Sequence, residues 1–187
     1  AISGGHLNPA VTLGLAAIGK FPWSEVPGYL AAQMTGGVLG AAIVWLAYLP
    51  HWAETENPAF KLGIFCTTPA IRRPAANLLT EIIGTFVLVL GVLAILTPKN
   101  LNPTQGWDVG FGPLLVGVLV LAIGLSLGGP TGYAINPARD LGPRLAHALL
   151  PIAGKGGSDW GYAWVPALGP VIGGIAGALF YRALWGG

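Results

Sequence analysis

The distribution of charge along the chain restricts its fold more than any other feature. Four long runs contain no Asp, Glu, Lys or Arg: Val26–Ala53, Ile82–Pro98, Val109–Ala138 and Trp160–Tyr181. A helix that crosses a bilayer needs about 20 mostly apolar residues, because in lipid every backbone polar group must be satisfied within the segment. Only 9% of the residues are charged, against roughly 25% in a soluble domain. The chain is therefore predicted to be an all-α membrane protein.

The hydrophobic pattern predicts both full spans and shorter segments. We expect four spans, at Ser24–Tyr48, Ala75–Thr97, Gly112–Gly128 and Ala163–Leu184, separated by polar loops at Pro50–Pro74, Pro98–Phe111 and Pro151–Tyr162. Two further apolar segments, Pro9–Gly19 and Pro137–Leu150, are about half as long as a span needs to be, so they are predicted to be half-helices. Glycines four residues apart, which let helices approach closely in lipid, are Gly36 with Gly40, Gly124 with Gly128, and Gly169 with Gly173 and Gly177.

Charge and cysteine content exclude several kinds of partner. A net charge of +2 is too small for a nucleic-acid-binding surface, which needs clustered Lys and Arg. The single cysteine, Cys66, excludes an intrachain disulfide and a multi-cysteine metal site. We expect no cofactor and no bound metal.

A short internal repeat introduces each half-helix. Residues 3–12 align with residues 131–140 around a shared Asn-Pro-Ala, formed by Asn8, Pro9 and Ala10 in the first copy and by Asn136, Pro137 and Ala138 in the second. Asn favours the N-cap position and Pro the first helical position, so each Asn-Pro predicts a helix start. The glycine-containing residues before it are expected to be extended, with unpaired carbonyls. Irregular backbone at membrane depth is tolerated only if it lines a cavity or is buried in protein, so the repeat predicts a pore.

The same repeat predicts what the pore admits. Two half-helix N-termini would bring positive dipole ends to the bilayer centre, beside two Asn amides that act as donors, so cations are repelled. The carbonyls of the leading segments would give acceptors to a neutral hydroxylated solute. These carbonyls belong to Gly4, Gly5, His6, Leu7, Gly132, Ala134 and Ile135.

The two motifs, 128 residues apart, resemble the signature loops of the major intrinsic protein family, the aquaporins and glycerol facilitators. The resemblance covers essentially the whole chain. It implies an aquaporin-like bundle in the plasma membrane, assembled as a homotetramer, with Asn8 and Asn136 as central donors. It also implies that Arg139 lies at the selectivity filter, and that Glu81 and Gln33 brace the re-entrant loops.

Other positions resemble the glycerol-conducting branch of the family. Water-selective members usually have a histidine where this chain has Gly124, and Tyr133 stands where glycerol facilitators most often have Phe. Further residues that match the glycerol-facilitator pattern are Tyr48, Asp140, Arg144, Pro166 and Ala167. The resemblance therefore implies a passive channel for glycerol and water that excludes ions and protons.

The repeat is lopsided, which bears on domain organisation. We expect one channel domain over residues 1–187, in which residues 75–187 form the second repeat and residues 1–74 the remainder of the first. If both halves are built alike, about 60 residues with two further spans would precede Ala1.

Three other functions were weighed. A water-selective channel, or one for urea or metalloid acids, stays open within the same family. An ion-coupled transporter would need several ionisable groups within its spans, and Glu81 is the only acidic residue in mid-span. A hydrolase is suggested by Gly124–Gly128, which matches a nucleophile elbow around Ser126 and is followed by Asp140 and His147. An elbow requires a strand-to-helix turn, whereas this serine lies in an uncharged run suited to a membrane helix, so we expect no enzymatic activity.

Overall fold

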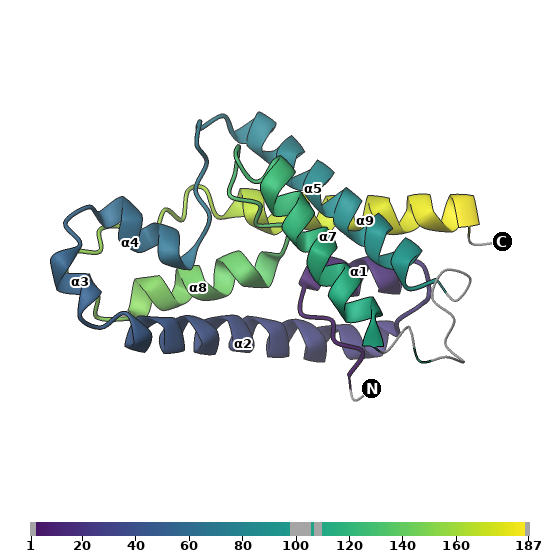
Figure 1. The fold of residues 1–187 in the computed structure, drawn as a ribbon, viewed down its shortest axis with the longest axis horizontal. Coiled ribbons are helices and arrows are strands. Elements are labelled where there is room, and N and C mark those ends of the chain that lie inside the picture. The colour runs from purple at the N-terminus through teal and green to yellow at the C-terminus, as the bar shows by residue number, and fades with distance from the viewer. Residues whose placement is uncertain (1–2, 98–105, 107–109, 186–187) are drawn as a thin grey trace.

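The computed structural model describes residues 3–97, 106 and 110–185, and within these ranges all regular structure is helical, as predicted. The helices are α1 (Pro9–Ala17), the short 3-10 helix η1 (Trp23–Glu25), α2 (Val26–Ala47), α3 (His51–Glu54), α4 (Pro58–Phe65), α5 (Pro74–Ile95), α7 (Gly112–Leu127), α8 (Pro137–Leu149) and α9 (Trp164–Trp185). In Figure 1, the short helices α1 and α8 lie between the long helices α2 and α9, and α3 and α4 gather at one end.

The four predicted spans coincide with α2, α5, α7 and α9, and their ends differ from the prediction by at most two residues. Three helices of the described chain are long and apolar enough to cross a membrane: Trp23–Ala47, Pro74–Ile95 and Trp164–Trp185. Helix α7 has only 16 residues, which corresponds to about 24 Å at 1.5 Å per residue. The two predicted half-helices are α1 and α8. Most of the expected loop Pro98–Phe111 lies outside the described residues.

The prediction that Pro50–Pro74 is an irregular loop is wrong, because this segment contains α3 and α4. Helix α4 begins at a third Asn-Pro-Ala sequence, at residues 57–59, which was not predicted to start a helix. The side chain of Asn57 accepts a hydrogen bond from the backbone N–H of Ala59 at 2.9 Å, and Pro58 is the first helical residue. Trp52 and Phe65 are buried against α2 and α8, in a cluster with Ala41, Ala146 and Ile152. This connection therefore forms a packed cover over the outer end of α8.

Only some of the predicted glycine pairs pack helices together. On α9, a Cβ added at Gly173 would lie 2.2 Å from the carbonyl of Ile82, and one added at Gly177 would lie 2.7 Å from that of Phe86, both on α5. The spacing on α9 is thus a helix-packing stripe, as predicted. On α2, by contrast, Gly36 and Gly40 meet no described atom within 4 Å, so their predicted packing role is wrong for the described part of the chain.

Each half-helix packs closely against a long helix from the other repeat. A Cβ added at Gly174 of α9 would lie 2.7 Å from the carbonyl of Ala10 in α1, and one added at Gly37 of α2 would lie 2.7 Å from the carbonyl of Ala138 in α8. Ala10 and Ala138 are the last residues of the two Asn-Pro-Ala motifs. The two contacts are therefore equivalent, and they make the internal repeat visible in the packing.

Candidate functional site

The two Asn-Pro-Ala motifs meet through their asparagines. Each Asn caps its own helix: the side-chain oxygen of Asn8 accepts from Ala10 N at 2.9 Å, and that of Asn136 accepts from Ala138 N at 3.0 Å. Each amide nitrogen reaches across to the other motif. Asn8 Nδ2 donates to the carbonyl of Ile135 at 2.7 Å, and Asn136 Nδ2 donates to that of Leu7 at 2.9 Å. The half-helices are thus locked N-terminus to N-terminus, and each amide keeps a second N–H that these bonds do not use.

The leading segments differ from the extended conformation expected of them. Gly4, Gly5 and Gly132 have positive φ angles of 71°, 71° and 78°, and so do two residues with side chains, Tyr133 (41°) and Ile135 (42°). Left-handed residues are costly without a compensating contact, and in the second motif that contact comes from Glu81. The segments are therefore folded loops whose peptide groups point in different directions.

The expectation that all seven leading carbonyls are unpaired is also wrong. The carbonyls of Leu7 and Ile135 accept from the asparagines of the opposite motif. The carbonyl of His6 accepts from Gln33 Nε2 at 2.7 Å. The carbonyls of Gly132 and Ala134 accept no hydrogen bond from the described part of the chain. Ala134 is only 1% exposed, so of these two residues it is the partly exposed Gly132 that can offer its carbonyl to a solute. The physical reason is that the carbonyl before each asparagine accepts the hydrogen bond that joins the two motifs.

Two long-helix side chains hold the leading segments in place. Glu81 of α5 is 1% exposed, and its two carboxylate oxygens accept from the N–H groups of Ala134 at 3.0 Å and Ile135 at 2.8 Å. Gln33 of α2 holds the first segment, since its Nε2 donates to His6 O and, at 2.9 Å, to Thr12 Oγ1. Each of the two side chains therefore connects a long helix to one leading segment.

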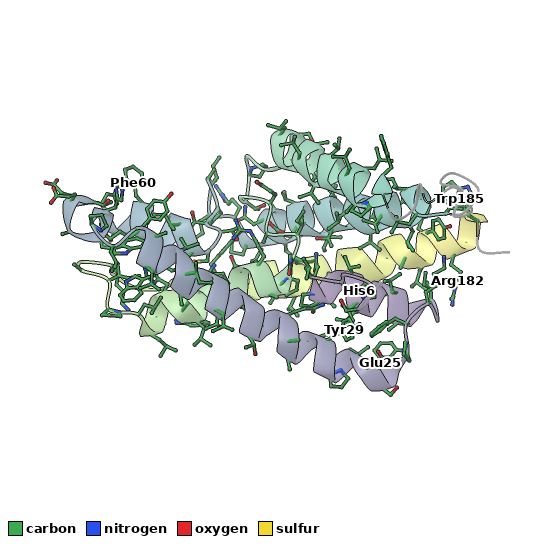
Figure 2. All side chains as sticks on the ribbon, turned by 60° about the horizontal axis from the view of Figure 1, so that its bottom comes forward. His6, Glu25, Tyr29, Phe60, Arg182 and Trp185 are labelled. Carbon is green, nitrogen blue, oxygen red and sulfur yellow. The ribbon has the colours of Figure 1, made fainter. Side chains whose placement is uncertain are left out.

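An aromatic cluster that the sequence analysis missed lies beside the first motif. The ring of His6 lies 5.1 Å from that of Phe21 and 5.6 Å from that of Tyr29. The hydroxyl of Tyr29 donates to the carbonyl of Ser3 at 2.6 Å. His6 and Tyr29 are close together in Figure 2, where α1 approaches α2. The cluster fixes the start of the first leading segment.

The three predicted filter residues do not all line one cavity: Tyr133 contacts Gly124 of α7, and neither borders the groove that Arg139 lines. Tyr133 packs directly on Gly124, because a Cβ added at Gly124 would lie 2.9 Å from Cζ of the tyrosine ring. Arg139 lies in the first turn of α8 and is exposed. It lines a groove of about 540 Å³ together with both motifs, whose other lining residues include His6, Leu7, Gln33 and Asn136. Arg139 and Asn136 thus line the same groove.

The five subclass markers lie outside this groove. Asp140 and Arg144 form an ion pair at 2.8 Å with both side chains 0% exposed, and Pro166 is also fully buried. Tyr48 ends α2 and is 43% exposed, and Ala167 is half-buried in the first turn of α9. Since Asp140, Arg144 and Pro166 are buried, their side chains do not contact a solute in the groove.

Comparison with known proteins agrees with this geometry. Residues 1–181 match the family described as "Major intrinsic protein". The "Probable glycerol uptake facilitator protein" of Thermotoga maritima is 63% identical over 184 residues, which cover 98% of this chain and 76% of the relative. The "Glycerol uptake facilitator protein" of Bacillus subtilis is 60% identical over 186 residues, covering 100% of this chain and 65% of the relative.

A solved structure has the same fold. The aquaglyceroporin from Plasmodium falciparum superposes with a TM-score of 0.83 at 30% identity, over 97% of this chain and 73% of that one. The paired motifs, the helical bundle and these similarities agree on one assignment. The chain belongs to the major intrinsic protein family and is an integral membrane protein.

Proposed function

We propose that this chain forms the transport path of a passive glycerol facilitator. The observation that carries the proposal is the reciprocal pair of hydrogen bonds between the two motifs, which places two helix N-termini and two asparagine amides at one point. The names of its relatives, glycerol uptake facilitators at up to 63% identity, support glycerol as the solute. We further propose that the protein works as a homotetramer, as the family resemblance implies.

Selectivity follows from the charges that face the groove. The N-termini of α1 and α8 each carry a partial positive charge, and Arg139 adds a full one, so cations are repelled while an uncharged solute is not. Glycerol offers hydroxyls to the asparagine amides, to Arg139 and to the free carbonyl of Gly132. The ring of Tyr133 gives its carbon backbone an apolar surface. Gly124 and Tyr133 together are proposed to set the width of the filter with Arg139.

The structure disfavours the two rivals from other functional classes. Glu81 is proposed to be structural rather than a proton carrier, because both of its oxygens already accept backbone N–H groups. Ser126 lies within α7, where its hydroxyl donates to the carbonyl of Ala122 at 2.7 Å. An intrahelical serine of this kind is not positioned as the nucleophile of a hydrolase. We therefore propose a channel that performs no chemistry.

Light scattering from proteoliposomes tests the substrate. The protein, reconstituted at its full natural length, is exposed in turn to gradients of glycerol, urea and an impermeant sugar. We expect vesicles to shrink and then re-swell in glycerol, and only to shrink in the sugar. Fast water flow without glycerol entry would favour the water-selective alternative, and glycerol accumulation above equilibrium on a proton gradient would favour a coupled transporter.

Replacing Arg139 tests the exclusion of ions. Arg139→Ala removes the full charge found among the described residues that line the groove, so proton and cation leak are expected to rise by roughly tenfold at little cost to glycerol flux. Arg182→Ala is the matched control, since this exposed arginine lies at the far end of α9 (Figure 2). A pH-sensitive dye trapped in the vesicles reports the leak. Equal leak in wild type and Arg139→Ala would assign ion exclusion to the helix ends alone.

A further inference from the structure

Thr67, in the connection between α4 and α5, uses every polar group it has on two residues of α8. Its backbone N–H and its hydroxyl both donate to Asp140 Oδ2, at 2.7 and 2.6 Å. Its carbonyl accepts from Arg144 Nη2 at 3.0 Å. The residue is 5% exposed. A buried threonine whose N–H, hydroxyl and carbonyl groups are all hydrogen-bonded is fixed in position.

The ion pair that binds Thr67 is itself completely satisfied. Arg144 has five N–H donors. Two go to Asp140 at 2.8 and 3.1 Å, one to Thr67, and two to the carbonyls of Ser158 and Asp159 at 2.8 and 3.0 Å. Asp140 accepts four hydrogen bonds, three at Oδ2 and one at Oδ1, so both of its oxygens are paired. A buried polar network with every member paired is rigid and holds one arrangement.

Thr67 also touches the segment on the other side of the filter. A Cβ added at Gly132 would lie 3.4 Å from both Cβ and Cγ2 of Thr67, so the threonine methyl packs on the backbone just before Tyr133. Close by, the N–H of Ala70 donates to the carbonyl of Pro130 at 3.1 Å. The connection that carries Thr67 is therefore attached to the leading segment as well as to α8.

These contacts bracket the proposed filter in sequence and in space. Gly132 directly precedes Tyr133, and Asp140 directly follows Arg139. Thr67 bonds to Asp140 and packs against Gly132. The side chains of Thr67, Asp140 and Arg144 are buried, so they do not touch a solute in the groove. Their effect on selectivity must act through the positions of Tyr133 and Arg139.

We infer that Thr67, held by Asp140 and Arg144, is a positioning residue that sets the separation of Tyr133 and Arg139 and thereby the size limit of the filter. This inference rests on the proposed glycerol pathway. The hydroxyl of Thr67 holds the residues around Arg139 through its hydrogen bond to Asp140. Its methyl group packs against the backbone of Gly132, next to Tyr133. Loss of either contact lets Tyr133 and Arg139 move apart, so the flux of solutes larger than glycerol is expected to increase more than the flux of glycerol.

The experiment measures a ratio of fluxes, which a change in the amount of folded protein does not move. Thr67→Val keeps the shape and the methyl but removes the hydroxyl bond to Asp140, and Thr67→Ser keeps the hydroxyl but removes the methyl. Thr80→Val is the control, because its hydroxyl bonds to the carbonyl of Ala76 within α5 and to no other described residue. Proteoliposomes carrying the full-length protein are exposed to glycerol, to a five-carbon polyol and to an impermeant sugar.

We expect the five-carbon polyol to glycerol ratio to rise by at least about threefold in Thr67→Val and less in Thr67→Ser, with Thr80→Val at the wild-type ratio. Equal losses of both fluxes, or an unchanged ratio in both Thr67 variants, would overturn the inference that Thr67 sets the size limit of the filter. If Thr67→Val yields no folded protein, Thr67→Ser decides by the same criterion. A wild-type protein that passes no glycerol would instead refute the proposed function.

Discussion

The half-helices α1 and α8 begin alike and are held in different ways. Both start at an Asn-Pro-Ala, both are capped by the asparagine side chain, and both press an alanine carbonyl against a glycine of a long helix. Helix α1 contains no charged residue. Helix α8 contains Arg139, Asp140, Arg144 and His147, and the last three are 0% exposed.

The second half-helix is tied to its surroundings by polar contacts throughout its length. His147 Nδ1 lies 2.8 Å from Ser158 Oγ. At the C-terminus, Lys155 Nζ donates to the carbonyls of His147, Ala148 and Leu150 at 2.7 to 2.8 Å, which satisfies orphan carbonyls of the last turn. Helix α1 is fixed mainly by apolar and backbone contacts with α9. The features that α1 and α8 share, the asparagine caps and the glycine contacts, bring the two helix N-termini together. The buried charged residues, which α8 has and α1 lacks, are placed to support the proposed filter.

Removing one member of the buried ion pair should produce the largest effect. Asp140→Ala leaves the guanidinium of Arg144 buried without its carboxylate, so the protein should lose about 3–5 kcal/mol of stability. Thermal melting in detergent, followed by size-exclusion chromatography, measures the loss. Arg72→Ala is the control: Arg72 pairs with Asp159 at the surface, its side chain is 53% exposed, and the expected cost is below about 1 kcal/mol. Equal costs for the two variants would show that burial of the pair is unimportant.

The equivalent glycine contacts should respond equally. Gly37→Ala and Gly174→Ala each place a Cβ 2.7 Å from a backbone carbonyl, and overpacking of this kind costs about 1–3 kcal/mol. Gly117→Ala, where an added Cβ meets no described atom within 4 Å, should be neutral or slightly stabilising, since Ala is the better helix former. The same melting assay applies. A large difference between Gly37→Ala and Gly174→Ala would contradict the symmetry of the two half-helices.

Gly124→His should affect the second motif and not the first, because Gly124 contacts Tyr133. Because the ring of Tyr133 already fills the space beside Gly124, an imidazole must displace the ring or enter the proposed filter. Glycerol flux is expected to fall at least about tenfold more than water flux. Stopped-flow light scattering on proteoliposomes gives both fluxes, and Gly117→Ala serves as the reference on the same helix. If the histidine variant passes glycerol at the wild-type rate, Gly124 does not border the filter.

Cys66 offers the smallest and most local test, because it directly precedes Thr67. Burial raises the pKa of the Cys66 thiol to about 12, and the side chain is 2% exposed. The reactive form is the thiolate, so maleimide labelling at pH 8 should be roughly a thousandfold slower than in denatured protein. Since the pKa is raised on folding, the neutral thiol favours the folded state below about pH 9. That contribution is lost as the pH rises towards 12.

The same labelling reaction separates the two half-helices. Asp140→Ala should speed the labelling of Cys66 about threefold or more, because it frees Thr67 and the residues beside it. Gly174→Ala disturbs only the contact of α1 with α9 and should leave the rate unchanged. Mass spectrometry after quenching measures the labelled fraction. Acceleration by Gly174→Ala alone would show that Cys66 does not report on the ion-pair network.

Local chemistry explains why much of the fold could be predicted. The four segments predicted as spans match α2, α5, α9 and the shorter α7 to within two residues of each end, because a span must be apolar and internally hydrogen-bonded. The prediction failed at 50–74, where the tripeptide at Asn57 begins α4. It also failed for the carbonyls of His6, Leu7 and Ile135, whose partners lie in distant parts of the chain. No sequence signal pointed to Thr67, since its importance comes entirely from Asp140, Arg144 and Gly132.

The sequence by itself determined where three helices begin, because an asparagine followed by proline caps a helix at each such pair in the described residues, namely at Asn8, Asn57 and Asn136. Only the tertiary structure decided which two of these three tripeptides meet. Asn8 and Asn136 bond to each other's loops, whereas Asn57 caps a helix at the outer end of the molecule (Figure 1). The physical reason is that capping uses atoms two residues away, while a pore requires two helix ends brought together by the packing of α1 on α9 and of α8 on α2.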